Sequence, residues 1–397
     1  MLMNSMSNSR RQVLRAGLAA AGAGILQACG SSTTTVPKVT STTQPNTAKT
    51  GDNLLRVFAS SGYGESSSRS DLGLQRLYNA GFVVTNQQAC FRRYQRFAGS
   101  DLERIADLQD VASGRVATPK VLMGFRGGYG AMRLLPHIDW VNLGNRMREK
   151  GTLLYGFSDV TAIQLALLAK SGVPSFAGPM LYSEFAKPQP STYTLQSFVD
   201  NSTNPNMMVS VSDIQSREVS ADGLFWGGNL SVLSALAGSP YMPNIDGGIL
   251  FLEDVGEQPY RIERMLQTLY LAGVLGRQKA IVLGNFRMGS VRDVYDASYT
   301  LNSVIQTVSR VAKVPVLTGF PFGHITNKTT FPLGAHAQLR PSSNGGYQVR
   351  FSDYPVLSAN SLNLNTLLPQ PAFLDSGLGD RAPVGSDAIS DDSGDAE

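Results

Sequence analysis

Short apolar runs alternate with segments of helical periodicity along the first half of the chain. The apolar runs predict strands at 54–59, 81–84 and 121–125, and the periodic segments predict helices at 72–80 and 100–111. Ser100 and Glu103 have the spacing of a capping box, which marks the start of the second helix. This alternation predicts a doubly wound, mostly parallel α/β sheet whose ligands bind beyond the carboxyl ends of its strands.

The second half shows the same kinds of signal. It predicts strands at 248–252, 279–286, 314–318 and 333–339, and helices at 230–237 and 259–271. We therefore expect an N-terminal domain at 53–186 and a smaller C-terminal α/β or β-rich domain at 208–357, with the active site at their interface. Residues 187–207 are polar and contain proline, which favours a connection between the two domains.

Both ends of the chain have compositions unlike those of the two domains. Arg10 and Arg11 with Leu14 resemble a twin-arginine export signal, and Leu26 to Cys29 resembles the lipobox cleaved before a lipidated cysteine. We expect residues 1–28 to be the export signal, with Cys29 anchoring the exported protein in a membrane that faces the periplasm or cell wall. The alternative is an ordinary secretory signal with a chance cysteine. Segments 29–52 and 358–397 predict a flexible tether and a disordered tail.

The formal charge of +4 falls to +1 once the signal, with its three arginines, is removed. Because no run of Lys and Arg remains, nucleic acid is not expected as a partner. Cys29 and Cys90 are the chain's two cysteines, too few for a disulfide framework.

Ser158 follows an apolar run that ends at Phe157 and precedes a helical pattern, so it lies at a predicted strand-to-helix turn. Such a turn can present a serine hydroxyl as a nucleophile beside free backbone N–H groups. A helix N-cap is the alternative, because serine is also favoured there. Gly127 and Gly128 follow the strand at 121–125 and would let backbone N–H groups approach a reacting atom, although a tight turn needs the same residues.

A serine nucleophile needs a general base, and the chain has three histidines. His137 has apolar neighbours and is expected to be packed in an interface, and His336 is expected on a strand face. His324, in a glycine-flanked loop after a strand, is the best candidate, with Glu253 or Asp254 to orient it. Dispersed histidines provide no metal-binding pattern, so neither a metal nor another cofactor is expected. Cys90 lacks activating neighbours.

Several motifs together closely resemble the LD-carboxypeptidases, or muramoyltetrapeptide carboxypeptidases, over roughly residues 54–357. They are Arg126-Gly127-Gly128-Tyr129-Gly130, Gly156-Phe157-Ser158-Asp159, Trp226-Gly227-Gly228-Asn229-Leu230, Leu252-Glu253-Asp254 and Phe322-Gly323-His324. The resemblance implies Ser158 as nucleophile, His324 as base, Glu253 rather than Asp254 as its orienter, and the backbone N–H groups of Gly128 and Asp159 as the oxyanion hole.

The resemblance also implies metal-independent hydrolysis of the L,D bond before the terminal D-Ala of a murein tetrapeptide. Arg126 is a candidate for binding the substrate carboxylate, and a homodimer is possible. Two alternatives remain open: a serine peptidase of the same superfamily that cleaves peptide antibiotics of the microcin type, and a non-catalytic, wall-binding lipoprotein.

Overall fold

The computed structural model describes residues 52–212, 218–343 and 345–368. The predicted export signal, Cys29 and nearly all of the predicted tether lie outside these ranges, as does the tail beyond residue 368. No helix within the described ranges is long and apolar enough to cross a membrane. All described residues belong to one compact unit of the chain, Asn46–Glu397.

The first sheet has the strand order β11-β5-β4-β3-β1-β2. Its strands are β1 (Leu54–Phe58), β2 (Val83–Thr85), β3 (Val121–Gly124), β4 (Leu153–Gly156), β5 (Ser175–Ala177) and β11 (Phe331–Leu333). Strands β1 to β5 run parallel, and β11 is an antiparallel edge strand. The predicted doubly wound, mostly parallel sheet is confirmed.

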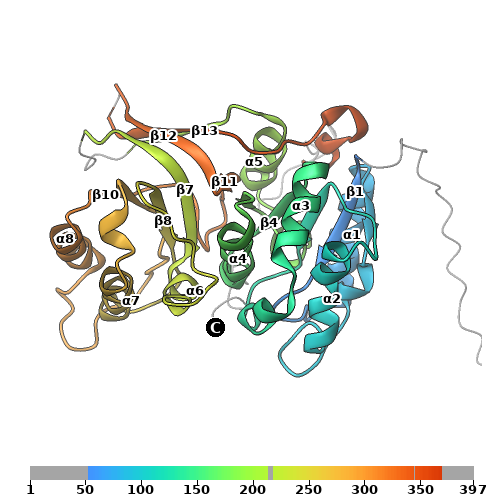
Figure 1. Cartoon of the computed structure of the whole chain (residues 1–397), viewed down its shortest axis with the longest axis horizontal. Coiled ribbons are helices and arrows are strands. Elements are labelled where there is room, and N and C mark those ends of the chain that lie inside the picture. Colours follow the sequence, from blue (N-terminus) through green and yellow to red (C-terminus); the bar gives the residue numbers. More distant parts are fainter. Residues whose placement is uncertain (1–51, 213–217, 344, 369–397) are drawn as a thin grey trace, which may run out of the picture. The chain divides into compact units, whose positions relative to one another are not determined.

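Helices cover both faces of this sheet (Figure 1). They are α1 (Ser67–Asn79), α2 (Asp101–Ala112), α3 (Trp140–Lys150), α4 (Thr161–Ser171) and α5 (Thr192–Thr203). Leu122 of β3 packs in one core with α2, α3 and α4, whereas Val121 and Met123 pack in another with α1 and α5. This division follows from the alternation of side chains along a strand. The predicted capping box of Ser100 and Glu103 is present at the start of α2.

The second sheet has the order β10-β9-β8-β7-β12-β13-β6. Its strands are β6 (Met208–Val211), β7 (Ala221–Asn229), β8 (Ile249–Glu253), β9 (Ala280–Leu283), β10 (Val316–Leu317), β12 (Ala335–Pro341) and β13 (Tyr347–Ser352). Strands β7 to β10 run parallel, whereas β12, β13 and β6 are antiparallel. Helices α6 (Leu230–Ala235), α7 (Pro259–Leu271) and α8 (Leu301–Ala312) accompany the parallel part.

A three-residue strand joins the two halves of the protein. Strand β11 pairs with β5 of the first sheet, and the chain then enters β12 of the second sheet through Gly334. Gly334 has a φ of 79°, and its N–H donates to the carbonyl of Phe225 on β7. One hydrophobic core includes residues from both halves, so the halves are tied together by packing as well as by the chain.

Two expectations at the domain boundaries differ from the structure. The predicted connection at 187–207 contains α5, whose Leu195 and Phe198 are buried in the core on the α1 face of the first sheet. The prediction of a disordered tail from residue 358 is wrong for residues 358–368, because Leu364 and Leu367 are buried in the same core. In both segments a few apolar residues among many polar ones supply the contact with the core.

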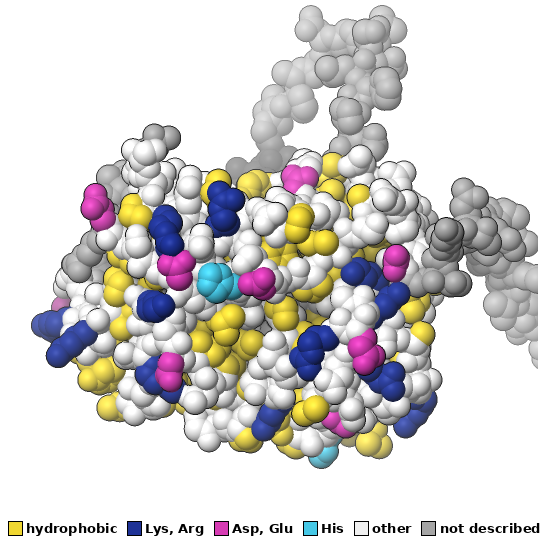
Figure 2. All heavy atoms as spheres, turned by 45° about the horizontal axis from the view of Figure 1, so that its top comes forward, with side chains coloured by type: hydrophobic (Ala, Val, Ile, Leu, Met, Phe, Trp, Pro, Cys, Tyr) yellow, Lys and Arg dark blue, Asp and Glu magenta, His cyan; other side chains and the backbone are white. Residues whose placement is uncertain are grey.

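Charged residues of both signs share the surface. On the face that Figure 2 shows, Lys and Arg side chains lie interspersed with Asp, Glu and hydrophobic ones. Neither sign of charge dominates this face, which agrees with the small net charge of the chain.

Candidate active site

Ser158 lies in a strained turn between β4 and α4. Its φ is 59°, in the left-handed region that non-glycine residues rarely adopt. Gly156 makes the turn possible, because a side chain there would collide with Val160. The Ser158 hydroxyl caps neither the 3₁₀ turn Ser158–Val160 nor α4, so the N-cap alternative is wrong. A strained serine at the carboxyl end of a central parallel strand is the arrangement of a nucleophile.

The glycine loop after β3 lies directly against this hydroxyl. A Cβ atom on Gly127 would be 2.7 Å from Ser158 Oγ, so only glycine fits here. Gly128 has a φ of 109°, which also favours glycine. The carbonyl of Gly127 accepts a hydrogen bond of 3.1 Å from the N–H of Gly62, in the loop after β1. The loop is therefore more than a tight turn, because its backbone contacts the predicted nucleophile.

His324 and Glu253 form a buried pair at the carboxyl end of the second sheet. His324 Nδ1 lies 2.8 Å from Glu253 Oε2, and the side chains are 5% and 1% exposed. The His324 ring packs edge-on against Phe157, with 5.2 Å between ring centroids. Because Phe157 precedes Ser158 in the chain, this contact places the imidazole beside the nucleophile turn. Residue patterns left open whether Glu253 or Asp254 orients His324, and in the structure Glu253 makes the hydrogen bond.

Several charges act on the pKa of His324. Burial lowers it, but the Glu253 carboxylate and its hydrogen bond outweigh burial, so the net pKa is raised above its ordinary value. Asp254 raises the pKa further, and the Lys328 ammonium opposes it. Lys328 is itself buried in an ion pair with Glu184, with 2.9 Å between Nζ and Oε1. Sequence patterns gave no indication of this pair, because a charged pair in a core has no local periodicity.

Asn229, at the end of β7, connects both acidic residues to helix α6. Its side-chain Nδ2 lies 3.2 Å from Glu253 Oε1 and 3.3 Å from Asp254 Oδ1, and its Oδ1 accepts the N–H of Val232 at the start of α6. Asp254 also accepts the N–H of Ser231. Burial, followed by repulsion from Glu253, raises the pKa of Asp254 to about 7. The Gly-Gly-Asn sequence at the end of a strand is the pattern from which Asn229 could have been predicted as a site residue.

The side chain of Asp159 ties two loops to the nucleophile turn. Its Oδ2 accepts hydrogen bonds from Ser61 Oγ at 2.6 Å and from the N–H of Ala131 at 2.8 Å. Arg104, which is 1% exposed, donates to the carbonyls of Ser60 and of Gly130 in the same two loops. Burial raises the pKa of Asp159, although the hydrogen bonds from Ser61 and Ala131 lower it. These contacts fix the glycine loop at both of its edges.

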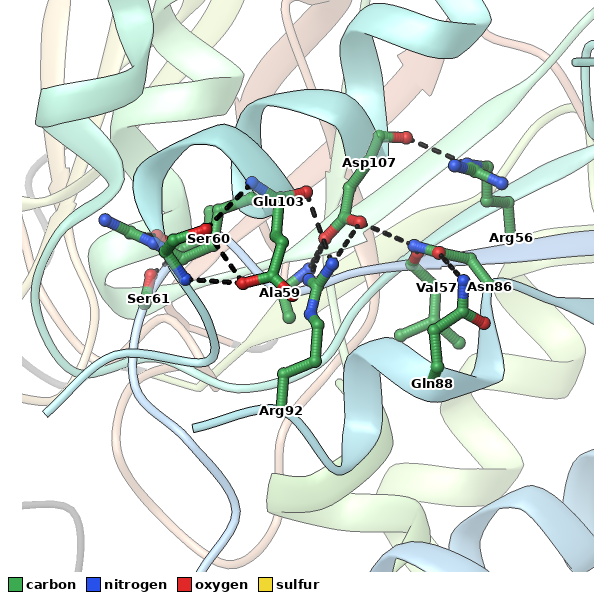
Figure 3. Close-up of polar contacts among 12 residues, drawn as sticks. Arg56, Val57, Ala59, Ser60, Ser61, Asn86, Gln88, Arg92, Glu103 and Asp107 are labelled. Carbon is green, nitrogen blue, oxygen red and sulfur yellow. Dashed lines mark hydrogen bonds and ion pairs between the residues drawn. The ribbon is translucent and has the colours of Figure 1, made fainter. Parts of the chain in front are cut away.

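A second buried carboxylate holds the end of β1 (Figure 3). Asp107 accepts the N–H of Ala59 at 2.9 Å and the Asn86 amide at 2.7 Å, and it forms an ion pair with Arg92 at 2.6 Å. Its backbone carbonyl accepts from Arg56. The loop that carries Ser61 is therefore held at Ala59 by Asp107 and at Ser61 by Asp159.

We predict that Ser61→Ala lowers kcat about 10- to 100-fold while KM changes little. Without the Ser61 hydroxyl, the carboxylate of Asp159 loses a hydrogen bond, and the glycine loop shifts relative to Ser158. Kinetics on a tetrapeptide substrate would measure this. Ser70→Ala is the matched control, because Ser70 is also buried but donates to the carbonyl of Cys90 in the 3₁₀ turn Gln87–Cys90. Equal kcat values for the two variants would contradict the prediction.

A cavity of about 470 Å³ opens at Ser158. Both halves line it: Gly128, Tyr129, Met132, Ser158 and Asp159 from the first, and Asn229, Ser231, Asp254 and Glu257 among others from the second. Arg126 is not among the lining residues and donates to the carbonyl of Tyr63 at 2.9 Å. The position of Arg126 therefore gives no support to its predicted role in binding the substrate carboxylate.

The other candidate residues lie apart from this cavity. His137 is exposed at the end of the 3₁₀ turn Ala131–His137, so its expected packing in an interface is wrong; its neighbours Leu134 and Leu135 fill the core instead. His336 lies on β12, as predicted. Burial raises the pKa of Cys90 to about 12, which suits a structural thiol. No cluster of metal-binding side chains occurs within the described residues.

Comparison with known proteins places the chain in a family. The LD-carboxypeptidase N-terminal domain matches residues 55–178, and the LD-carboxypeptidase C-terminal domain matches residues 222–339. A probable murein peptide carboxypeptidase of Bacillus subtilis is 29% identical over 68% of this chain and 83% of its own length. The microcin C7 self-immunity protein of Escherichia coli is 27% identical over 66% of this chain and 82% of its own length.

A solved structure gives the same result. The crystal structure of the muramoyltetrapeptide carboxypeptidase of Oxalobacter formigenes is 37% identical, covers 76% of this chain and all of its own, and superposes with a TM-score of 0.69. The two matched domains span more than half of the chain, and the resemblance seen in the sequence motifs is confirmed. The chain belongs to the LD-carboxypeptidase family of serine carboxypeptidases.

Proposed function

We propose that this protein removes the terminal D-Ala from murein tetrapeptides by cleaving the L,D bond before it, without a metal ion. The observation that carries the proposal is the hydrogen-bonded pair of His324 and Glu253, held beside the strained turn of Ser158. These three side chains are a nucleophile, a base and an orienting carboxylate.

In the proposed reaction, Ser158 Oγ attacks the carbonyl carbon of the L-centre while His324 takes the hydroxyl proton. The backbone N–H groups of Gly128 and Asp159 stabilise the oxyanion. Asp159 lies in the nucleophile turn, and Gly128 lies in the glycine loop that packs against this turn. When the C–N bond breaks, the imidazolium gives its proton to the amine of the departing D-Ala. Water then hydrolyses the acyl-enzyme with His324 again as base, which releases the tripeptide and restores the Ser158 hydroxyl.

Mass spectrometry of a murein tetrapeptide incubated with the purified protein tests the proposal. We expect a tripeptide and free alanine as products, in the presence or absence of a chelator. An unchanged tetrapeptide would refute the proposed activity. It is the result expected of a non-catalytic wall-binding protein.

Cleavage of a microcin-type peptide antibiotic is a second candidate. It is favoured by the match to the microcin C7 self-immunity protein, which is only slightly less similar than the murein carboxypeptidase relative. A direct comparison of kcat/KM for a murein tetrapeptide and for a peptidyl-nucleotide antibiotic would rank the two substrates.

We further propose that the protein is an exported lipoprotein anchored at Cys29. Support comes from the arginine pair, the apolar run and the lipobox-like segment in the sequence. The active site would then reach murein on a tether of about 20 flexible residues, which spans roughly 25 Å on average and at most about 70 Å.

Deletion of residues 31–46 is expected to leave cleavage of a soluble tetrapeptide unchanged, because no proposed site residue lies there. The same deletion should reduce trimming of tetrapeptides in the intact wall, since the anchored domain loses reach. Muropeptide analysis of cells with full-length and shortened forms at matched abundance would measure the tetrapeptide-to-tripeptide ratio. Equal ratios would mean that the tether's reach has no role.

A further inference from the structure

Basic and aromatic side chains lie on the loops after β1 and β3 and on the segment before α2, and we call this set the rim. It consists of Tyr63, Arg93, Tyr94, Arg96 and Tyr129. Tyr94 and Tyr129 are 54% and 49% exposed, which is high for aromatic side chains next to a packed core. Tyr129 also lines the cavity, and the guanidinium carbon of Arg96 lies 5.5 Å from the centroid of its ring.

Backbone hydrogen bonds hold the part of the rim around Tyr94 and Arg96. The N–H groups of Tyr94 and Phe97 each donate to the other's carbonyl at 2.9 Å, which closes a tight turn with Arg96 at its tip. Phe97 is buried, and the N–H of Ala98 donates to the carbonyl of Ser61 in the loop after β1. The same loop is fixed by Asp159, so the rim and the nucleophile turn share one support.

Arg93 is the most informative residue of the rim. Its guanidinium carbon lies 4.1 Å from the centroid of the Tyr63 ring, and within the described residues no acidic side chain pairs with it. The nearby Arg92, Arg104 and Arg133 are each paired with Asp107 or Asp101. An arginine stacked on an aromatic ring keeps its in-plane N–H donors available and loses little side-chain entropy on binding a carboxylate. Arg93 is thus an oriented cation without an acidic partner in the part of the chain that the structure describes.

We propose that this rim binds the peptidoglycan strand outside the stem that is being cleaved, with Arg93 contacting a carboxylate of the polymer and Tyr94 and Tyr129 contacting its sugars and peptide. This inference rests on the proposed function. Murein fits the surface because it carries acidic peptide stems on a sugar chain, and because Tyr129 belongs both to the rim and to the cavity that would hold one stem. A polymer therefore gains contacts that a free tetrapeptide lacks.

The test compares Arg93→Gln with wild type, using the full chain on two substrates, a free tetrapeptide and isolated sacculi. We expect kcat/KM to fall about five- to tenfold more on sacculi than on tetrapeptide, because one charge-assisted contact is lost. Arg93→Lys should recover only part of the loss, since lysine keeps the charge without the stacked fork. Arg310→Gln, an exposed arginine on α8, is the matched control and should not change the ratio between substrates.

An equal effect of Arg93→Gln on both substrates would overturn the rim proposal while leaving the proposed hydrolysis intact. Loss of binding to phosphatidylglycerol vesicles with normal trimming of sacculi would also overturn it, because the rim would then contact a membrane. If the wild-type protein hydrolyses neither substrate, the proposed function itself is wrong.

Discussion

Replacement of Ser158 by alanine is expected to lower hydrolysis of a murein tetrapeptide by about 10⁴-fold or more, because the reaction loses its nucleophile. The fold should persist, since the hydroxyl caps no helix and alanine differs from serine by one oxygen atom. Steady-state kinetics and thermal unfolding, measured on the same preparation, would separate the two effects. Full activity of folded Ser158→Ala would refute the proposed mechanism.

Ser158→Gly is the companion variant, and it tests the strain in the turn. Glycine adopts the φ of 59° without a steric penalty, so this variant should be about 1 kcal/mol more stable than Ser158→Ala and equally inactive. A chelator should affect neither the wild-type rate nor the stability of the variants. Loss of wild-type activity in a chelator would point to metal-assisted hydrolysis instead.

Much of the fold could be predicted because it is encoded locally. The apolar runs of β1, β3, β4 and β8, and the capping box of α2, can be recognised without knowledge of distant contacts. Ser158 and His324 could be singled out for the same reason, since each follows a predicted strand. The order of strands then brings their loops to one edge of each sheet.

The remaining features depend on contacts between distant residues. Strand β11 has three residues, one of them proline, and exists only because β5 offers an open edge. Arg104 binds backbone carbonyls of two loops, and such acceptors have no signature in a sequence. His137 was misjudged because apolar neighbours in sequence do not fix which side of a 3₁₀ turn is buried.

His324→Ala is expected to have an effect nearly as large as that of Ser158→Ala, with a loss of about 10⁴-fold in kcat, because the Ser158 hydroxyl is a poor nucleophile without a base. His137→Ala and His336→Ala are matched controls, since the first histidine is exposed and the second lies on β12, away from the cavity lining. Both should act through stability if they act at all. A folded His324→Ala protein with wild-type kcat would exclude the proposed triad.

The pH profile gives a sharper test of the same histidine. Because the pKa of His324 is raised above its ordinary 6.5, the acidic limb of kcat/KM should lie above pH 6.5, where the imidazole becomes protonated and cannot accept the Ser158 proton. Glu253→Gln removes the carboxylate that contributes most to this rise, so the limb should move to lower pH while the maximal rate falls. Asp254→Asn should move it in the same direction by less, since Asp254 raises the pKa of His324 less than Glu253 does. An unchanged limb in folded Glu253→Gln would show that the limb does not report His324, whereas loss of the limb in Asp254→Asn would assign it to Asp254, whose own pKa is raised to about 7.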